Sequence, residues 1–290
     1  MARGKKTDIL LDLIRDGRPM TLRQQLRLTV ELSVPAIIAQ LSSIIMQYID
    51  AAMVGRIGAE ASASIGLVST TTWLFWGLCT AAATGFSVQV AHKVGAGDLK
   101  GARMILRQSL VGTLVFSLLL ALLGVGISSS LPAWLGGDVS IRRDASTYFF
   151  IFSIFLPVLQ TIFLAGSMLR CSGNMRIPSL LGVIMCVLDV VFNFFLIFPT
   201  RGYSVADVQF ILPGAGLGVS GAALGTAAAE TVAAGVLLWY LLTRSKKLRY
   251  LRGEGRFRLK AETFSNAFRI GFPMGIEHVV ICGAQILTTV

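Results

Sequence analysis

A carboxylate and a proline lie within one helix-length, mostly apolar stretch, residues 29–56. Because about 20 apolar residues cross a bilayer core as a helix, this stretch predicts a membrane span. Asp50 is costly to insert there and is therefore a candidate functional group, whereas Pro35 predicts a bend or hinge. The alternative for Asp50 is a solvated position at the membrane edge, six residues before Arg56.

A second polar pair, Asp189 and Asn193, lies in a later apolar run. The two residues are four apart and share one helix face. Asn193 precedes Pro199 by six residues, as Asp50 precedes Arg56, so all three side chains are expected to meet in the outer half of a bundle. Their oxygens suit Na⁺, and two neighbouring buried carboxylates equally suit H⁺. The alternative for Asp189 is a structural hydrogen bond to another helix.

Two further acids, Glu230 and Glu277, are candidates for an additional polar site. Glu230 adjoins a stripe of small residues, which predicts close packing of that helix face on another helix. The stripe is formed by Gly221, Gly225, Ala229 and Ala233. Glu230 is therefore either a functional group facing the bundle interior or a structural one. His278, next to Glu277, is either a further polar candidate or a histidine that serves only in helix packing.

Composition predicts a polytopic membrane protein. Of 290 residues, 54% are hydrophobic and only 14% charged, against about 25% charged in soluble domains. The four cysteines lie in apolar runs without paired or metal spacing, so neither a disulfide framework nor zinc is expected. Nucleophile–base spacing and metal-ligand clusters are also lacking, so we expect no enzyme and no cofactor beyond a bound Na⁺ or H⁺.

The apolar runs predict an all-α fold: a six-helix transmembrane bundle, residues 29–242, and a seventh span that opens a second, inverted or pseudo-symmetric bundle. The expected spans are about 29–53, 64–90, 108–128, 147–169, 179–198, 216–242 and 270 onward.

The basic residues predict the orientation. Of the 26 lysines and arginines, 22 precede the first span or follow the second, fourth and sixth. The positive-inside rule therefore places the N-terminal segment, residues 1–28, and the basic loop, residues 243–268, in the cytoplasm. Because topology explains the net charge of +11, nucleic-acid binding is not expected. The same loop could contact anionic membrane lipids.

The last run, residues 269–290, opens like the first. Pro273 aligns with Pro35, each preceded by a small residue two positions back and a charged residue four positions back. Transporters are often built from two such repeats. We therefore expect a truncated chain whose second helical bundle is missing and would need roughly five more spans.

Several stretches together resemble one family, the multidrug and toxic compound extrusion (MATE) transporters. They are DAAMVGRIG, TGFSVQVAHKVGAGDLKGARMILRQSL, LRCSGNMRIPSL, VLDVVFNFFLIFP, GLGVSGAALGTAAAE and RIGFPMGIEH, in the family's order and spacing from about residue 30 to 290. The family has twelve spans in two six-helix bundles, of which this chain resembles the first bundle plus one helix.

The resemblance implies a secondary active transporter that exports organic cations or other amphipathic compounds by Na⁺ or H⁺ antiport, with alternating access between the bundles. Asp50 matches an acid late in helix 1, and Pro35 matches the helix 1 proline. Asp189 and Asn193 match a helix 5 pair that some members carry in the opposite order, which leaves the ion ligand open. Glu277 matches an acid of some members.

Two other classes fit less well. A lipid-linked precursor flippase of the same superfamily would use cationic residues in its central cavity, yet spans 1–6 contain no mid-membrane lysine or arginine. A seven-helix receptor would favour an external N-terminus and a polar tail. We expect a multi-pass protein of the plasma membrane, the bacterial inner membrane, with a cytoplasmic N-terminus. Substrate identity and oligomeric state are not predicted.

Overall fold

The computed structural model describes residues 19–205, 208–251 and 259–289. Most of the predicted N-terminal segment 1–28, and part of the predicted loop 243–268, lie outside these residues. The described helices and strands are α2 (Leu22–Gly55), α3 (Ala59–Gly95), α4 (Leu99–Ile127), α5 (Leu131–Trp134), α6 (Val139–Ile154), α7 (Leu156–Cys171), α8 (Arg176–Ile197), β1 (Pro199–Val205), β2 (Val208–Ala215), α9 (Gly218–Thr243) and α10 (Ala261–Thr289).

The predicted all-α membrane fold is confirmed. In the described part of the chain, five helices are long and apolar enough to cross a membrane, namely α2, α3, α4, α8 and α9. The bent pair α6 and α7 makes a sixth span if it is counted as one. The chain is therefore a multi-pass membrane protein. Helix α10 falls outside this set, so the seventh span stays a prediction.

The fourth predicted span, residues 147–169, is broken rather than continuous. Helix α6 ends at Ile154 and α7 begins at Leu156, with a 48° bend between them. Pro157 stands in the first turn of α7 and has no backbone N–H to continue the ladder of α6. The predicted span is therefore present as a bent pair of helices, and the break at Pro157 was not predicted.

Two helices begin earlier than the sequence indicated. Helix α2 begins at Leu22, inside the predicted N-terminal segment, because Thr21 and Gln24 form a capping box. Helix α10 begins at Ala261, inside the predicted loop 243–268. The segment before it lies on α4: Arg103 donates to the Lys247 carbonyl and Arg107 to the Leu251 carbonyl.

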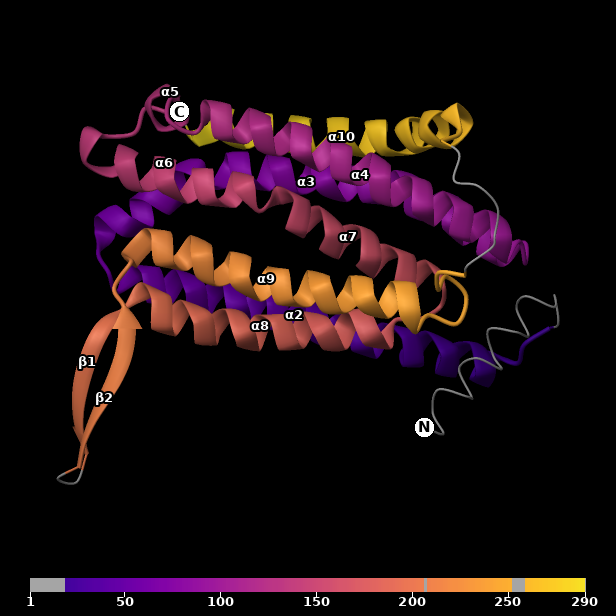
Figure 1. Cartoon of the computed structure of the whole chain (residues 1–290), viewed down its shortest axis with the longest axis horizontal. Helices are drawn as coiled ribbons and strands as arrows, with labels where there is room; N and C mark the ends of the chain where they lie inside the picture. The colour runs from indigo at the N-terminus through magenta and orange to yellow at the C-terminus, as the bar shows by residue number, and fades with distance from the viewer. Residues whose placement is uncertain (1–18, 206–207, 252–258, 290) are drawn as a thin grey trace.

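The helices are arranged around α7, which runs between two groups (Figure 1). On one side, α3 packs against α4 and α10; on the other, α9 packs against α8, and α2 lies mainly on α8. The hairpin of β1 and β2 extends from the end of the bundle where α8 ends and α9 begins (Figure 1). The two strands are antiparallel, with Pro199 opposite Ala215 and Val205 opposite Val208, and were not predicted.

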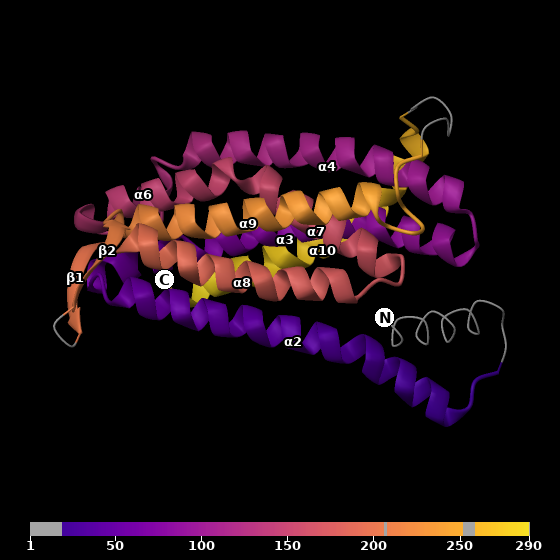
Figure 2. The same cartoon turned by 60° about the horizontal axis from the view of Figure 1, so that its bottom comes forward.

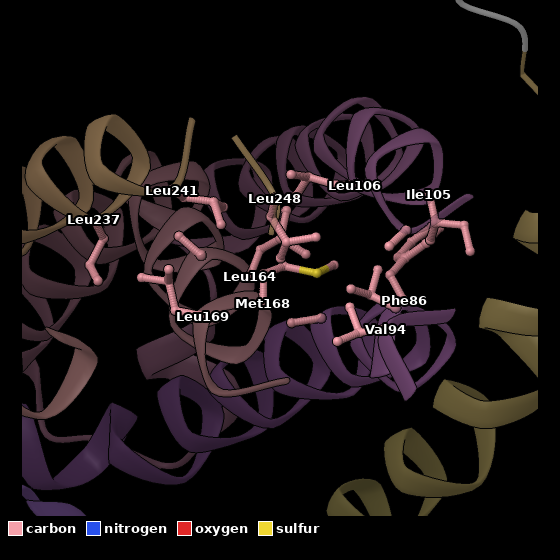
Figure 3. Packing of buried hydrophobic residues seen from close by; sticks show 14 of the residues in the cluster. Phe86, Val94, Ile105, Leu106, Leu164, Met168, Leu169, Leu237, Leu241 and Leu248 are labelled. Carbon is pink, nitrogen blue, oxygen red and sulfur yellow. The ribbon is translucent and has the colours of Figure 1, made fainter. Parts of the chain in front are cut away.

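A buried apolar cluster fills the half of the bundle near the 244–251 segment (Figure 3). Leu164, Met168 and Leu169 of α7 lie at its centre, each at most 1% exposed, against side chains of α3, α4 and α9. Since lipid tails are as apolar as leucine, tight packing rather than water exclusion holds such helices together. Large apolar side chains on the outer faces are accordingly exposed, as Leu41 and Leu122 are.

Candidate functional site

The structure brings Asp50, Asp189 and Asn193 together. The Asn193 amide donates from Nδ2 to Asp50 Oδ1 at 3.0 Å and to Asp189 Oδ2 at 3.1 Å. Asp189 is 1% exposed and Asn193 is fully buried. One amide of α8 thus joins a carboxylate of its own helix to a carboxylate of α2, as their spacing predicted.

Two oxygens of this cluster have free acceptor capacity. Asp189 Oδ1 and Asn193 Oδ1 are buried without a hydrogen-bond partner among the described residues. Buried carboxylate and amide oxygens without donors are suited to a hard cation, and a proton would serve the same need. The described residues contain no group of three or more His, Cys, Asp or Glu side chains for a metal ion.

Helix α9 closes the cluster from a third side. Gly225 lies so near Asn193 that an added Cβ would overlap its amide oxygen, and at Gly221 it would meet the Leu196 carbonyl of α8. The predicted small-residue stripe therefore packs on α8. The next residue, Thr226, places its side chain beside the Asp189 carboxylate. Close helix approach here positions a hydroxyl at the site.

Glu230 lies one turn beyond Thr226 on α9. It lines a cavity of about 130 Å³ with Thr226 and with aromatic side chains of α3 and of the α6–α7 break. Tyr148 of α6 lines the same cavity and lies within electrostatic reach of Asp50, Asp189 and Glu230. The interior orientation expected from the small-residue stripe is therefore observed, but Glu230 forms no part of the Asp50–Asn193–Asp189 cluster.

The remaining candidates lie elsewhere. Glu277 is exposed on α10, which packs mainly on α3, so the structure does not bring it to the cluster. His278 packs against Gly77 of α3. Pro35 lies inside the continuous helix α2, and its role as a hinge stays a prediction.

Sequence reasoning missed Thr226, Tyr148 and the aromatic lining of the cavity. Thr226 could have been found, because it precedes Glu230 by four residues and so shares its helix face. Tyr148 gave no comparable signal, since its importance depends on how α6 packs against α9.

Comparison with known proteins identifies relatives of this chain. The MatE family model matches residues 35–195. A probable multidrug resistance protein NorM of Thermotoga maritima is 23% identical over 251 residues, which cover 87% of this chain and 51% of that protein. The multidrug export protein MepA of Staphylococcus saprophyticus is 25% identical, covering 86% and 52%.

Among solved structures, a MOP superfamily transporter from Pyrococcus furiosus superposes with a TM-score of 0.75 at 20% sequence identity, over 86% of this chain and 52% of that one. At this identity the likeness shows the fold. The chain spans about half the length of the curated relatives it matches.

Proposed function

The chain belongs to the MatE family, and we propose that it carries the ion-coupling half of a multidrug efflux transporter. Such a transporter exports amphipathic or cationic small molecules in exchange for Na⁺ or H⁺ moving inward. The exchange uses alternating access between this helical bundle and a second one. The names of the NorM and MepA relatives support the substrate class.

The observation that carries the proposal is the buried Asp50–Asn193–Asp189 cluster. Its two carboxylates lie on different helices and share a single amide donor. Without a cation or proton the two negative charges repel each other, and with one they are held together. Ion binding can therefore favour the conformation in which α2 lies against α8.

The energy available for coupling is set by the difference in ion affinity between two conformations. Coupling free energies between sites are typically about 1–3 kcal/mol. Na⁺ and H⁺ both fit the cluster, since its free oxygens accept either. We further propose that the transporter lies in the plasma membrane with the N-terminus and the 243–268 segment in the cytoplasm, as the distribution of basic residues supports.

The test is gradient-driven efflux from cells or proteoliposomes containing the intact transporter. Asp50→Asn and Asp189→Asn each remove one charge with little change in shape. Both are expected to lower ion-driven efflux at least tenfold, while the protein still inserts. Asp144→Asn, an exposed acid of α6, is the matched control and should leave efflux within about twofold. Wild-type rates in both aspartate variants, under Na⁺ and pH gradients alike, would disprove the proposal.

A further inference from the structure

A second anionic group stands apart from the Asp50–Asn193–Asp189 cluster, in the cavity of about 130 Å³ between α3, α6 and α9. Glu230 of α9 contributes its carboxylate, and the lining includes the rings of Trp76, Tyr148, Phe152 and Phe155. We call this space the Glu230 cavity.

The Glu230 carboxylate has neither a hydrogen bond nor an ion pair among the residues that the structure describes. A carboxylate inside a helical bundle is costly unless it is paired, bound to a cation or protonated. No lysine or arginine lines the Glu230 cavity. The cation that completes this site must therefore come from a ligand or be a proton.

The walls of the cavity decide which ligand fits. Na⁺ prefers several oxygen ligands, but beside the Glu230 carboxylate the lining offers only three hydroxyls, those of Thr72, Tyr148 and Thr226, among apolar and aromatic side chains. Aromatic rings attract ammonium groups through their faces, and tryptophan does so best. The Trp76 ring packs edge to face against Phe163, with ring centroids 4.9 Å apart. One carboxylate among rings is the chemistry of a site for an alkylated ammonium ion.

We propose that the Glu230 cavity binds the ammonium head group of an organic cation, with Glu230 as its counter-ion, at a place separate from the Asp50–Asn193–Asp189 cluster. Pockets for whole drug-sized molecules measure about 300–1,000 Å³. At about 130 Å³, the cavity holds a head group, and the rest of a larger molecule extends out of it.

The two sites are close enough to affect each other. Thr226 lines the Glu230 cavity and lies beside Asp189, and Glu230 itself acts electrostatically on Asp189. A positive charge in the cavity therefore opposes a cation at the carboxylate pair, and the reverse holds by linkage. This antagonism rests on the proposed function for its biological use, because exchange transport needs one cation to weaken the binding of the other.

The test is equilibrium binding of radiolabelled choline to the whole chain in lipid nanodiscs, with 3,3-dimethylbutan-1-ol as the uncharged analogue of the same shape. Wild type is expected to bind choline, and the alcohol should displace the bound choline only poorly. Glu230→Gln should weaken choline binding at least tenfold and leave the alcohol unaffected. The control is Asp144→Asn, an exposed acid of α6 outside both sites, which should keep choline binding within about twofold of wild type. Choline binding within twofold of wild type in Glu230→Gln overturns the proposal.

A second variant guards against misfolding of the first. Trp76→Leu keeps an apolar wall but removes a ring face, so choline affinity should fall about threefold to tenfold and affinity for the alcohol should not. Equal competition by the alcohol and choline in wild type, or loss of Na⁺ binding alone in Glu230→Gln, also overturns the proposal.

Antagonism is measured with the same assay. At constant pH, saturating Na⁺ should lower choline affinity about tenfold in wild type, and the effect should disappear in Asp189→Asn. Choline binding without any gradient-driven efflux would contradict the proposed transport function and leave the binding site intact, so the two failures are distinguishable.

Discussion

Helices α2 and α3 are of similar length but are held very differently. In α3, thirteen residues are buried, and the helix contacts α4, α6, α7 and α10. In α2, only Leu28 and Val54 are buried, and the principal contact is with α8. Figure 2 shows α2 running along the edge of the described bundle, at an increasing distance from it towards its N-terminal end.

The difference indicates that α3 is a helix fixed by packing, whereas α2 is a helix that can move. Helix α3 is fixed on several sides, so a shift would disturb many packed side chains at once. Helix α2 contains Pro35 and brings Asp50 to Asn193 through one hydrogen bond. A charge change at the Asp50–Asn193–Asp189 cluster can therefore move α2 against α8 while α3 stays in place.

The largest expected effect tests the packing half of this comparison. Phe75 of α3 is 4% exposed and packs edge-on against Phe149, with centroids 5.7 Å apart. Phe75→Ala should lower the free energy of unfolding by about 3–5 kcal/mol because it leaves a cavity. Leu41→Ala on α2, where the side chain is 54% exposed, should change it by about 0.5 kcal/mol or less. Denaturant titration in mixed micelles measures the free energy of unfolding of both variants. Equal losses would contradict the distinction between a fixed α3 and a movable α2.

A smaller effect concerns the contact that α8 makes with α9 beside the cluster. At Gly225 an added Cβ would overlap the Asn193 amide, whereas at Gly235 of the same helix nothing lies within 4 Å. Gly225→Ala should displace Asn193 and lower ion-driven efflux several-fold. Gly235→Ala should preserve efflux and stabilise α9 by up to about 1 kcal/mol through helix propensity. Efflux assays and thermal unfolding of both variants measure these effects. Unimpaired efflux in Gly225→Ala would show that ion-driven efflux does not depend on the position of Asn193.

The spans and the Asp50–Asn193–Asp189 cluster are the features that could be predicted from the sequence. The apolar runs predicted the spans, and equal spacing from the outer ends predicted that Asp50 meets Asp189 and Asn193. Those inferences need only helix periodicity and membrane depth. The ion-coupling role of the three residues stays a prediction.

The missed features depend on local chemistry that was overlooked or on tertiary contacts. Pro157 marked the α6–α7 break but lies within an otherwise apolar run. The Glu230 cavity could not be predicted, because its rings come from α3, α6 and the break, and only packing brings them to α9. Side-chain periodicity on one helix carries no information about which side chains of another helix it meets.

A more modest effect tests whether Pro35 gives α2 its mobility. Asp50 lies 15 residues beyond Pro35, about 22 Å along a helix at about 1.5 Å per residue, so a small angle change there displaces Asp50 by several ångströms. Spin labels on α2 and α8 should change separation when Na⁺ or H⁺ is added to wild type. In Pro35→Ala this change should be lost, because the restored hydrogen bond stiffens the helix. The same change in both proteins would show that Pro35 is a static kink.

The smallest expected effect lies in the turn that fixes the end of α3 to α4. Asp98 caps α4 by accepting a hydrogen bond from the Gly101 N–H at 2.8 Å, and it pairs with Lys93 of α3 at 3.1 Å. The Gly101 N–H, aided by Lys93, lowers the pKa of Asp98 below its ordinary value. A carboxyl with a lowered pKa in the folded state stabilises it above the unfolded pKa, and that stabilisation is lost as the pH falls through the folded pKa.

Asp98→Asn keeps a capping acceptor but loses the charge, so it should be slightly less stable than wild type at neutral pH. The difference should begin to shrink as the pH falls below the ordinary aspartate pKa of about 4, because the unfolded wild type then takes up a proton that the folded state still resists. Thermal unfolding of wild type and Asp98→Asn between pH 3 and 7 measures this difference, and Asp144→Asn, at an exposed position of α6, serves as the control. A difference that persists undiminished at pH 3 would mean that the charge of Asp98 does not help to fix the end of α3.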